Sequence, residues 1–401
     1  MTWPGYSSFV LIGWTSLLVP SLIRAIEHDF DQPDAGLGLL YLVSALLYVV
    51  GSLGVGVLAG RIGRRAVLPA AALLIGAGLL TEGLASAWEV LLAGVAITAV
   101  GAGAVDAGVN ALFLDLFPAG RGGALNRLHL FFSVGAMAAP MVVGWLVEAG
   151  VGWRLLMVGS AGAALAVSAA LAAAGQVPVR RPGPGSGGER ATGGSGVPLP
   201  LLALGVAIGC CVAAELGVSS WLVGFLAAEP LAVATFALGL FWAGLALGRL
   251  VSIHLADRYD LVVFGSWAAL LAALAIAAAV LGPGGAISVA MFGVAGFGLG
   301  PIYPVIMALA GTFYPARASS VSGMLTAAGV VGSIVYPPAI GLASASVGLG
   351  FGMLGAAVMA ACCSLAVVAS GRSARRAGSR ADAATPVDER PAGADPDPGS
   401  G

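Results

Sequence analysis

Long apolar runs alternate with short polar breaks along the chain, and each run is about twenty residues long. About 20 consecutive apolar residues are enough to cross the hydrocarbon core of a bilayer as an α-helix. The runs are Ser8–Ile26, Gly36–Ala59, Val67–Ala85, Val90–Leu116, Ala124–Val147, Leu155–Ala174, Leu199–Ser220, Ala232–Val251, Leu261–Leu281, Ala286–Ala310, Ser319–Ala343 and Leu349–Ala369. The pattern predicts an all-α integral membrane protein with twelve transmembrane helices.

The first six runs and the last six repeat each other at a constant offset of 197 residues, with no gap between the matching positions. Phe117-Pro118-Ala119 recurs as Tyr314-Pro315-Ala316, and Gly135, Pro140 and Gly144 recur as Gly332, Pro337 and Gly341. We therefore expect two pseudo-symmetric halves of six helices, residues 1–174 and 199–370.

The segments outside the halves have a different composition. Residues 175–198 are rich in Gly, Pro and Ser and carry three arginines, so they are predicted to form a flexible linker. Residues 371–401 are basic first, then acidic and rich in proline, and we expect a disordered tail.

Composition excludes several classes of function. Hydrophobic residues make up 59% of the 401 residues and charged residues 9%, whereas a soluble domain carries about a quarter charged residues. The net charge of −1 leaves no basic surface for nucleic acid. We find no metal-ligand spacing, phosphate-binding loop or nucleophile triad, so neither a cofactor nor an enzyme is expected. The first run has no basic residues before it, which favours a span over a cleaved signal peptide.

The arginines predict the orientation, because cytoplasmic loops carry an excess of positive charge. If the N-terminus is cytoplasmic, the short inner loops and helix ends carry eight arginines and the outer side two, Arg24 and Arg154. The eight are Arg61, Arg64, Arg65, Arg121, Arg127, Arg249, Arg258 and Arg317. We expect a cell-membrane protein, monomeric, with both termini and the linker inside.

The loop after the second run, Gly56-Val57-Leu58-Ala59-Gly60-Arg61-Ile62-Gly63-Arg64-Arg65, resembles the cytoplasmic signature of the major facilitator superfamily. Gly60 replaces the usual Asp, which the second half retains in Leu255-Ala256-Asp257-Arg258. The resemblance implies two six-helix halves with a substrate site between them. It also implies a cytoplasmic gate, formed here by Arg61, Arg64, Arg65, Asp257 and Arg258. Plain positive-inside charge is the alternative for the first loop.

A narrower resemblance lies in the fourth and fifth runs. Val105-Asp106-Ala107-Gly108-Val109-Asn110, followed by Leu125-Asn126-Arg127-Leu128-His129, looks like the fucose–proton symporter family and its glucose/galactose relatives. That family ties the acid of helix four and the polar residues of helix five to proton coupling and sugar binding. It has a further acid four residues before the proline of helix one, where this chain has Ser16.

Asp106 lies near the middle of its run with no other charge from Val90 through Leu114. A carboxylate at that depth costs several kcal/mol unless it is protonated, paired or hydrated, so Asp106 is a candidate proton carrier. Asn110, Asn126 and His129 are expected to form a polar patch beside it that binds substrate, and the second half has Met307, Gly323 and Thr326 at these positions. Structural hydrogen bonds between helices are the alternative for Asp106 and the two asparagines, and an ordinary histidine at the inner rim is the alternative for His129.

The second half offers Glu215, Trp221 and Tyr303 as further substrate-binding candidates. Glu215 would bind substrate or lock an outer gate, and the aromatic rings would stack on a sugar ring. For the acid the alternative is a structural bond between helices. For the rings it is anchoring at the membrane interface or ordinary packing.

The sequence thus predicts a secondary transporter that imports a small polar solute such as a sugar together with protons. The alternatives are a proton-coupled exporter of small molecules in the same superfamily, and a membrane sensor or scaffold that has lost transport.

Topology reporters test the orientation. Fusions after Gly188 and after Gly401 should both report a cytoplasmic location, because the excess of arginine on that side opposes translocation. An external signal from either fusion would contradict the predicted number or orientation of the spans.

Overall fold

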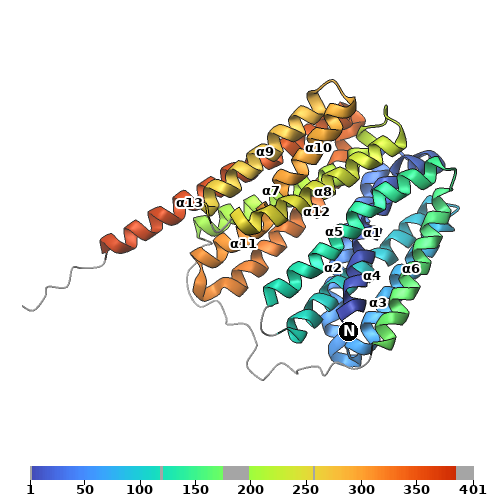
Figure 1. Ribbon diagram of the computed structural model, residues 1–401, viewed down its shortest axis with the longest axis horizontal. Coiled ribbons are helices and arrows are strands. Elements are labelled where there is room, and N and C mark those ends of the chain that lie inside the picture. The colour runs from blue at the N-terminus through green and yellow to red at the C-terminus, as the bar shows by residue number, and fades with distance from the viewer. Residues whose placement is uncertain (1, 118–120, 175–197, 256–257, 385–401) are drawn as a thin grey trace, which may run out of the picture.

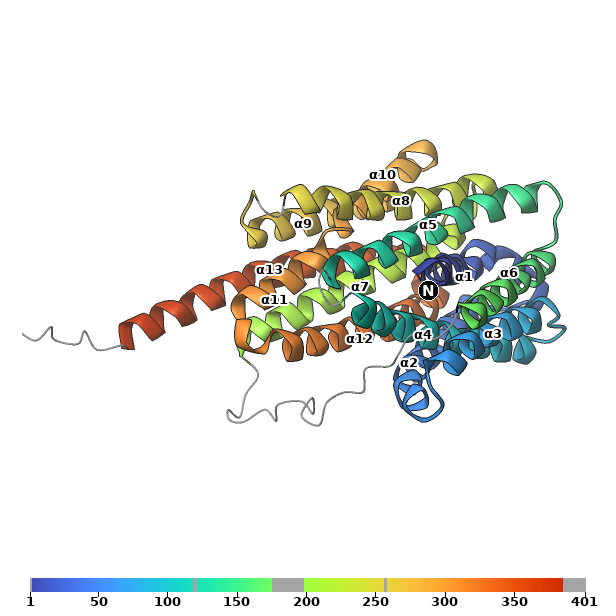
Figure 2. The same cartoon turned by 60° about the horizontal axis from the view of Figure 1, so that its bottom comes forward.

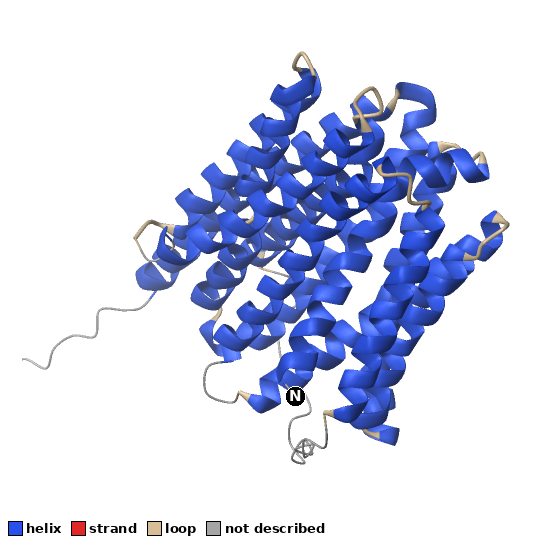
Figure 3. Cartoon of the chain, turned by 45° about the vertical axis from the view of Figure 1, so that its right-hand side comes forward, coloured by secondary structure: helices blue, strands red, loops and turns tan. Residues whose placement is uncertain are grey.

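The computed structural model describes residues 2–117, 121–174, 198–255 and 258–384, which form helices and short connections without a strand (Figures 1 and 3). The first half contains α1 (Thr2–Phe30), α2 (Asp34–Ile62), α3 (Arg64–Gly83), α4 (Trp88–Leu116), α5 (Arg121–Glu148) and α6 (Trp153–Ala173). The second contains α7 (Leu199–Phe225), α8 (Leu231–Leu255), α9 (Leu261–Leu281), α10 (Gly285–Leu299), α11 (Ile302–Phe313), the 3-10 turn η1 (Pro315–Arg317), α12 (Ala318–Val347) and α13 (Leu349–Ala384).

Twelve segments of the described chain are long and apolar enough to span a membrane, which confirms the predicted fold class. The tenth span, Gly285–Phe313, is interrupted between α10 and α11 at Gly300 and Pro301. Proline has no backbone N–H to donate and fixes its own φ, so the helix is broken at this point.

The last helix continues further than the sequence analysis expected. Residues 371–384, assigned there to a disordered tail, extend α13 as a helix beyond the ends of its neighbours (Figure 2). This stretch is rich in alanine and arginine, two residues with high helix propensity, and this preference outweighs its polarity.

Glycines allow the helices of each half to pack backbone against backbone, and the repeat is visible in these contacts. A Cβ at Gly103 of α4 would strike the carbonyl oxygen of Tyr48 in α2, and a Cβ at Gly300 would strike that of Leu245 in α8. Both the glycines and the carbonyls are 197 residues apart. The sequence repeat is therefore also a repeat of helix packing.

Gly135 tests the importance of this close packing. A Cβ there would strike the carbonyl oxygen of Val10 in α1, and a backbone atom cannot move aside as a side chain can. Gly135→Ala should lower the free energy of unfolding by about 1–3 kcal/mol, the usual cost of overpacking. Thermal unfolding in detergent measures this. Gly54→Ala is the control, because its Cβ would meet nothing within 4 Å; equal melting temperatures for the two variants would contradict the packing argument.

Candidate functional site

Asp106 lies between α4 and α2, with both carboxyl oxygens hydrogen-bonded. The Tyr48 hydroxyl donates to Oδ2 at 2.8 Å, and Nδ2 of Asn110, one turn further along α4, donates to Oδ1 at 3.0 Å. The close approach at Gly103 brings Tyr48 within reach, and Ser52 Oγ donates to the Gly103 carbonyl at 3.1 Å. The acid therefore has two neutral donors and no cationic partner in the described structure.

Asn110 carries an unused acceptor. Its Oδ1 is buried and accepts no hydrogen bond within the described part of the chain. A buried polar atom without a partner costs about 1–3 kcal/mol, so native proteins rarely retain one without a reason. Beside a carboxyl group, this oxygen is a point at which a hydroxyl of a bound molecule can donate.

Asn126 and His129 lie on an exposed face of α5, and no contact of either with Asp106 is found in the described structure. His129 packs edge-on against Phe9 of α1, with ring centroids 5.6 Å apart. The structure therefore joins Asp106 to Asn110 by a hydrogen bond, and among the contacts that it describes neither residue bonds to Asn126 or His129.

In the second half, the Arg249 guanidinium of α8 lies 3.6 Å from Oε1 of Glu215 in the adjacent helix α7. In the same half, the hydroxyls of Tyr303 in α11 and Thr326 in α12 are 3.3 Å apart. By the 197-residue offset, Tyr303 corresponds to Asp106 and Thr326 to His129. The two halves thus present different chemistry at equivalent positions.

Three tryptophans donate hydrogen bonds to other helices inside the bundle. Trp221 is 1% exposed and donates to the Pro337 carbonyl at 2.9 Å. Trp14 donates to Ser160 Oγ and Trp242 to Ser219 Oγ. In this conformation Trp221 therefore packs where α2, α7 and α12 meet, and has no free face for a sugar ring.

The halves are tied together at the end of the bundle that contains the α1–α2 connection, which we call the far side; the linker side is the opposite end. The Tyr41 hydroxyl of α2 donates to the Ser220 carbonyl of α7 at 2.6 Å, and Ser344 of α12 donates to Asp34. Glu148, the last residue of α5, accepts from the backbone N–H of Ala232 at the start of α8, at 2.9 Å. These bonds close the far side.

Arg24 of α1 makes the most extensive of these ties. Its guanidinium donates to the carbonyls of Val223, Leu226 and Glu229, at and just beyond the end of α7. The last carbonyls of a helix have no intrahelical partner and carry a partial negative charge. One arginine thus satisfies three acceptors of the opposite half.

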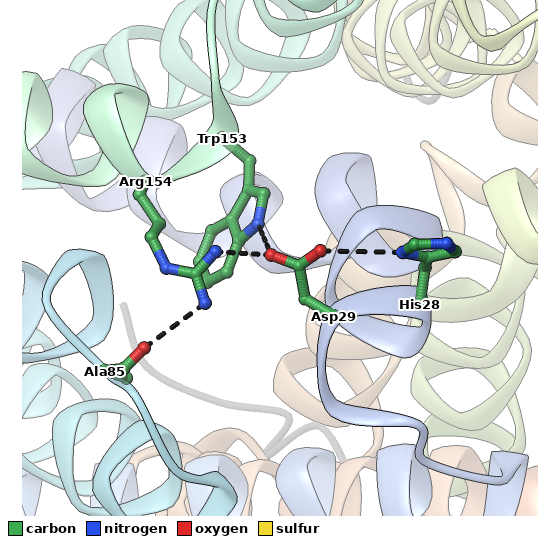
Figure 4. Close-up of polar contacts among 5 residues, drawn as sticks. All are labelled: His28, Asp29, Ala85, Trp153 and Arg154. Carbon is green, nitrogen blue, oxygen red and sulfur yellow. Dashed lines mark hydrogen bonds and ion pairs between the residues drawn. The ribbon is translucent and has the colours of Figure 1, made fainter.

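The first half has its own polar cluster on the far side (Figure 4). Asp29 accepts hydrogen bonds from Trp153 Nε1 at 2.7 Å and from Arg154, which also donates to the Ala85 carbonyl at 3.3 Å. These contacts tie α1, α6 and the α3–α4 connection together. Part of the acidic stretch from Glu27 to Asp34 is therefore structural.

The linker side is open by comparison. On α2, Leu53 is 72% exposed and Val57 63% exposed, and a Cβ at Gly54, Gly56 or Gly60 would meet nothing within 4 Å. Asn126 and His129 of α5 are exposed at this end, as is Met324 of α12. The interface helices therefore approach each other on the far side and separate on the linker side.

The predicted cytoplasmic gate is only partly within the described structure. Arg64 pairs with Asp115 at the end of α4, at 2.5 Å, which stays within the first half. Arg61, Arg65 and Arg258 are exposed, and Asp257 lies outside the described residues. Among the contacts that the structure describes, none joins an arginine of this gate to the opposite half.

Three polar residues were missed by the sequence analysis. Tyr48 was read as part of an apolar run, and Arg249 as positive-inside charge. Glu82 is 2% exposed in α3, and its carboxyl accepts from Thr98 of α4 at 2.5 Å. The repeat held one signal: the offset pairs Arg249 with Ser52, an unusual replacement inside an apolar span. No group of three or more His, Cys, Asp or Glu that could hold a metal ion is present in the described chain.

Two six-helix halves around a polar interface, tied at one end and open at the other, define a membrane transporter. The chain belongs to the Major Facilitator Superfamily, whose family model matches residues 6–337, and this confirms the predicted superfamily.

Curated relatives match over shorter segments. An uncharacterized MFS-type transporter, YfkL of Bacillus subtilis, is 25% identical over 147 residues, 36% of each chain. The sodium-dependent glucose transporter 1A of Mus musculus is 24% identical over 137 residues, 34% of this chain and 32% of that protein. The matches thus span about a third of these relatives.

Solved structures match over nearly the whole chain. A bacterial homologue of the human lysosomal transporter Spinster, inward-facing and occupied, has a TM-score of 0.76 at 16% identity, covering 93% of this chain and 96% of that one. The inward-open xylose transporter XylE from E. coli has a TM-score of 0.70 at 15% identity, covering 91% and 94%. At these identities the likeness shows the fold.

Arg24 is the residue to change to open the far side. Arg24→Gln keeps a donor but removes the charge and the multiple contacts with the end of α7, so the population closed on the far side should fall several-fold. Labelling of single cysteines placed on the two sides measures the populations. Arg154→Gln is the matched control, because its hydrogen bonds stay within the first half. Unchanged labelling in Arg24→Gln would show that the other ties suffice.

Proposed function

We propose that this protein is a secondary transporter that imports a small hydroxylated solute such as a sugar together with a proton, by alternating access across the cell membrane. The single observation that carries the proposal is the site at Asp106, an acid deep in a membrane span that is bonded by neutral donors alone beside an unused amide oxygen. Membership of the Major Facilitator Superfamily supports the transport part of the proposal.

The neutral surroundings of Asp106 favour a reversible charge. An acid paired with arginine is held in its ionised form while the pair is intact, whereas one that accepts only from a tyrosine and an amide is stable in the apolar interior when it carries a proton. The ionised form is tolerated when water enters the opened half. Asp106 is therefore suited to take a proton on one side and to release it on the other.

Hydrogen-bonding groups without fixed charge suit a hydroxylated substrate. Asn110 offers an acceptor, and Asn126 and His129 offer further donors and acceptors on the open side. A curated relative named as a glucose transporter and a structural neighbour named as a D-xylose–proton symporter favour a sugar. The first of these names also includes sodium, which makes a sodium gradient the necessary comparison.

The open linker side is the cytoplasmic side in this proposal, because the arginine asymmetry places the linker inside. The structure then corresponds to a state from which substrate leaves toward the cytoplasm. The far-side ties at Arg24, Tyr41, Asp34 and Glu148 form the gate that must break before substrate enters from outside.

Asp106→Asn separates coupling from binding. The amide mimics the protonated acid, so the variant should lose accumulation driven by a pH gradient but retain exchange of substrate at equal concentrations. Both are measured in proteoliposomes with a panel of radiolabelled sugars, with imposed pH or sodium gradients. Glu89→Gln, at an exposed acid in the first turn of the same helix, is the control and should behave as the unmodified protein.

Normal pH-driven accumulation by Asp106→Asn would refute proton coupling through this residue. Accumulation driven by a sodium gradient alone would show that sodium, and not the proton, is the coupling ion. Efflux without uptake would favour the exporter.

A further inference from the structure

The Glu215–Arg249 pair is a second charged site, which the Asp106 scheme does not use. Both residues lie within membrane spans, on the two adjacent helices α7 and α8. Charges at this depth are costly, and burying an ion pair often costs more than its attraction returns. The pair therefore needs a reason to be there.

The scaffold itself does not require the pair, because the first half is built without it. A Cβ at Gly135 would approach Val10 and Trp14 of α1, and one at Gly332 would approach Gly209 and Ala213 of α7. These contacts place the two helices at an offset of 199 residues, and at this offset Glu215 corresponds to Ser16.

Arg249, the other member of the pair, is also replaced by a serine in the first half. In the offset of 197 that relates α2 to α8, Arg249 corresponds to Ser52. Ser16 donates to its own helix, at the Ile12 carbonyl, and Ser52 donates to the Gly103 carbonyl. Two serines thus occupy, in one half, the places that an acid and a base occupy in the other.

The arginine is only loosely held. Its single contact with Glu215 is 3.6 Å long, and the two side chains are 29% and 13% exposed, respectively. A guanidinium has five N–H donors, and a structural pair with carboxylate is commonly bidentate at about 2.7–2.9 Å. Arg249 therefore has donors left for another acceptor.

Glu215 is the one carboxylate paired with Arg249 among the ion pairs of the described structure. His129 of α5, across the interface between the halves, lies within range of the Arg249 charge. Cys211 of α7 lies near both Glu215 and Arg249, and it contacts Cys363 of α13. Tyr336 of α12 donates to the Gly352 carbonyl, and the Tyr303 hydroxyl is next to Thr326. Arg24 of α1 is engaged at the far end of α7.

We propose that Arg249 binds a carboxylate of the transported solute, and that Glu215 holds the guanidinium when no solute is present. This rests on the proposed transport function and narrows its substrate class to small hydroxylated acids, such as sugar acids. A proton that binds the Glu215 carboxylate neutralises it and frees Arg249 for the carboxylate of the solute. Release of the solute and the proton restores the pair, so one proton accompanies one negative charge.

Matched probes separate the acid from the neutral sugar. D-glucuronate and D-glucose, and likewise D-galacturonate and D-galactose, differ at one carbon, which carries a carboxylate in one and a hydroxymethyl group in the other. The shift of the melting temperature of the purified full-length protein measures binding, at constant ionic strength, at about pH 5.5 and about pH 8. Either uronate should stabilise the protein more than its neutral partner, and more strongly at the lower pH, because protons compete with Arg249 for Glu215.

Variants assign the effect to the pair. Arg249→Gln should weaken uronate binding about tenfold or more, since it removes charge-assisted hydrogen bonds. Glu215→Gln should bind uronate equally well at both pH values, because the competitor for Arg249 is permanently neutral. Arg375→Gln is the control, at an exposed arginine that pairs with Asp260. If Arg249→Gln does not fold, the double variant Glu215→Ser with Arg249→Ser, which copies the first half, takes its place.

Several outcomes would overturn the proposal. These are the absence of stabilisation by either uronate, equal stabilisation by the neutral sugars, and uronate binding that survives the loss of Arg249. Its failure is distinct from failure of the proposed function. Neutral sugar accumulated through Asp106 by an Arg249 variant would leave the proposed function intact. Uronate binding through Arg249 without accumulation in a pH gradient would support the Arg249 site and contradict the proposed proton-coupled transport.

Discussion

The close approach of helix backbones at glycine is the constraint on which the structure depends. In lipid, apolar side chains gain little by leaving their surroundings, so association of helices relies on close contact and on hydrogen bonds between them. The contacts of Gly103 with Tyr48 and of Gly300 with Leu245 apply the same solution twice. These contacts also fix the depth of the functional groups in the membrane. Tyr48, which contacts Gly103, donates to Asp106, and Arg249 lies one turn after Leu245, which contacts Gly300.

The sequence was sufficient for the spans, the repeat and the superfamily, because lipid forces helices to be long and apolar and the repeat keeps one offset from the second run to the fifth. The shift of two residues between the first and seventh helices, to an offset of 199, emerged from the packing contacts. It was insufficient for the partners of the polar groups. Whether Asp106 faces Tyr48 or His129 depends on the rotation of α4 about its axis, which a span without other charges does not reveal. Arg249 was misread for a related reason, since a count of charges by side does not distinguish a loop arginine from one inside a helix. The extension of α13 to Ala384 was missed because polarity was given more weight than helix propensity.

Closure at one end follows from what each helix end needs. The carbonyls at the end of α7 and the first N–H groups of α8 lack partners in their own helices. Arg24 and Glu148 supply the missing donor and acceptor from the opposite half, each with the sign of charge that the helix terminus favours. The hydrogen bonds that satisfy these two helix ends thus also hold the halves together. When the halves separate, water must donate to the α7 carbonyls and accept from the α8 N–H groups instead.

The two walls of the interface solve the problem of a charge in the membrane in different ways. The first half keeps one acid among neutral donors, so its charge can vanish with a proton. The second half keeps an acid with a base, so its net charge is already zero and changes when a proton or an anion arrives. A symmetric scaffold permits this because the equivalent places do not require a charge: Ser16 is exposed and donates to its own helix, and Ser52 donates to the Gly103 carbonyl. The difference between the halves therefore lies in side chains that the packing leaves free to vary, which is where selection for a particular solute can act without disturbing the fold.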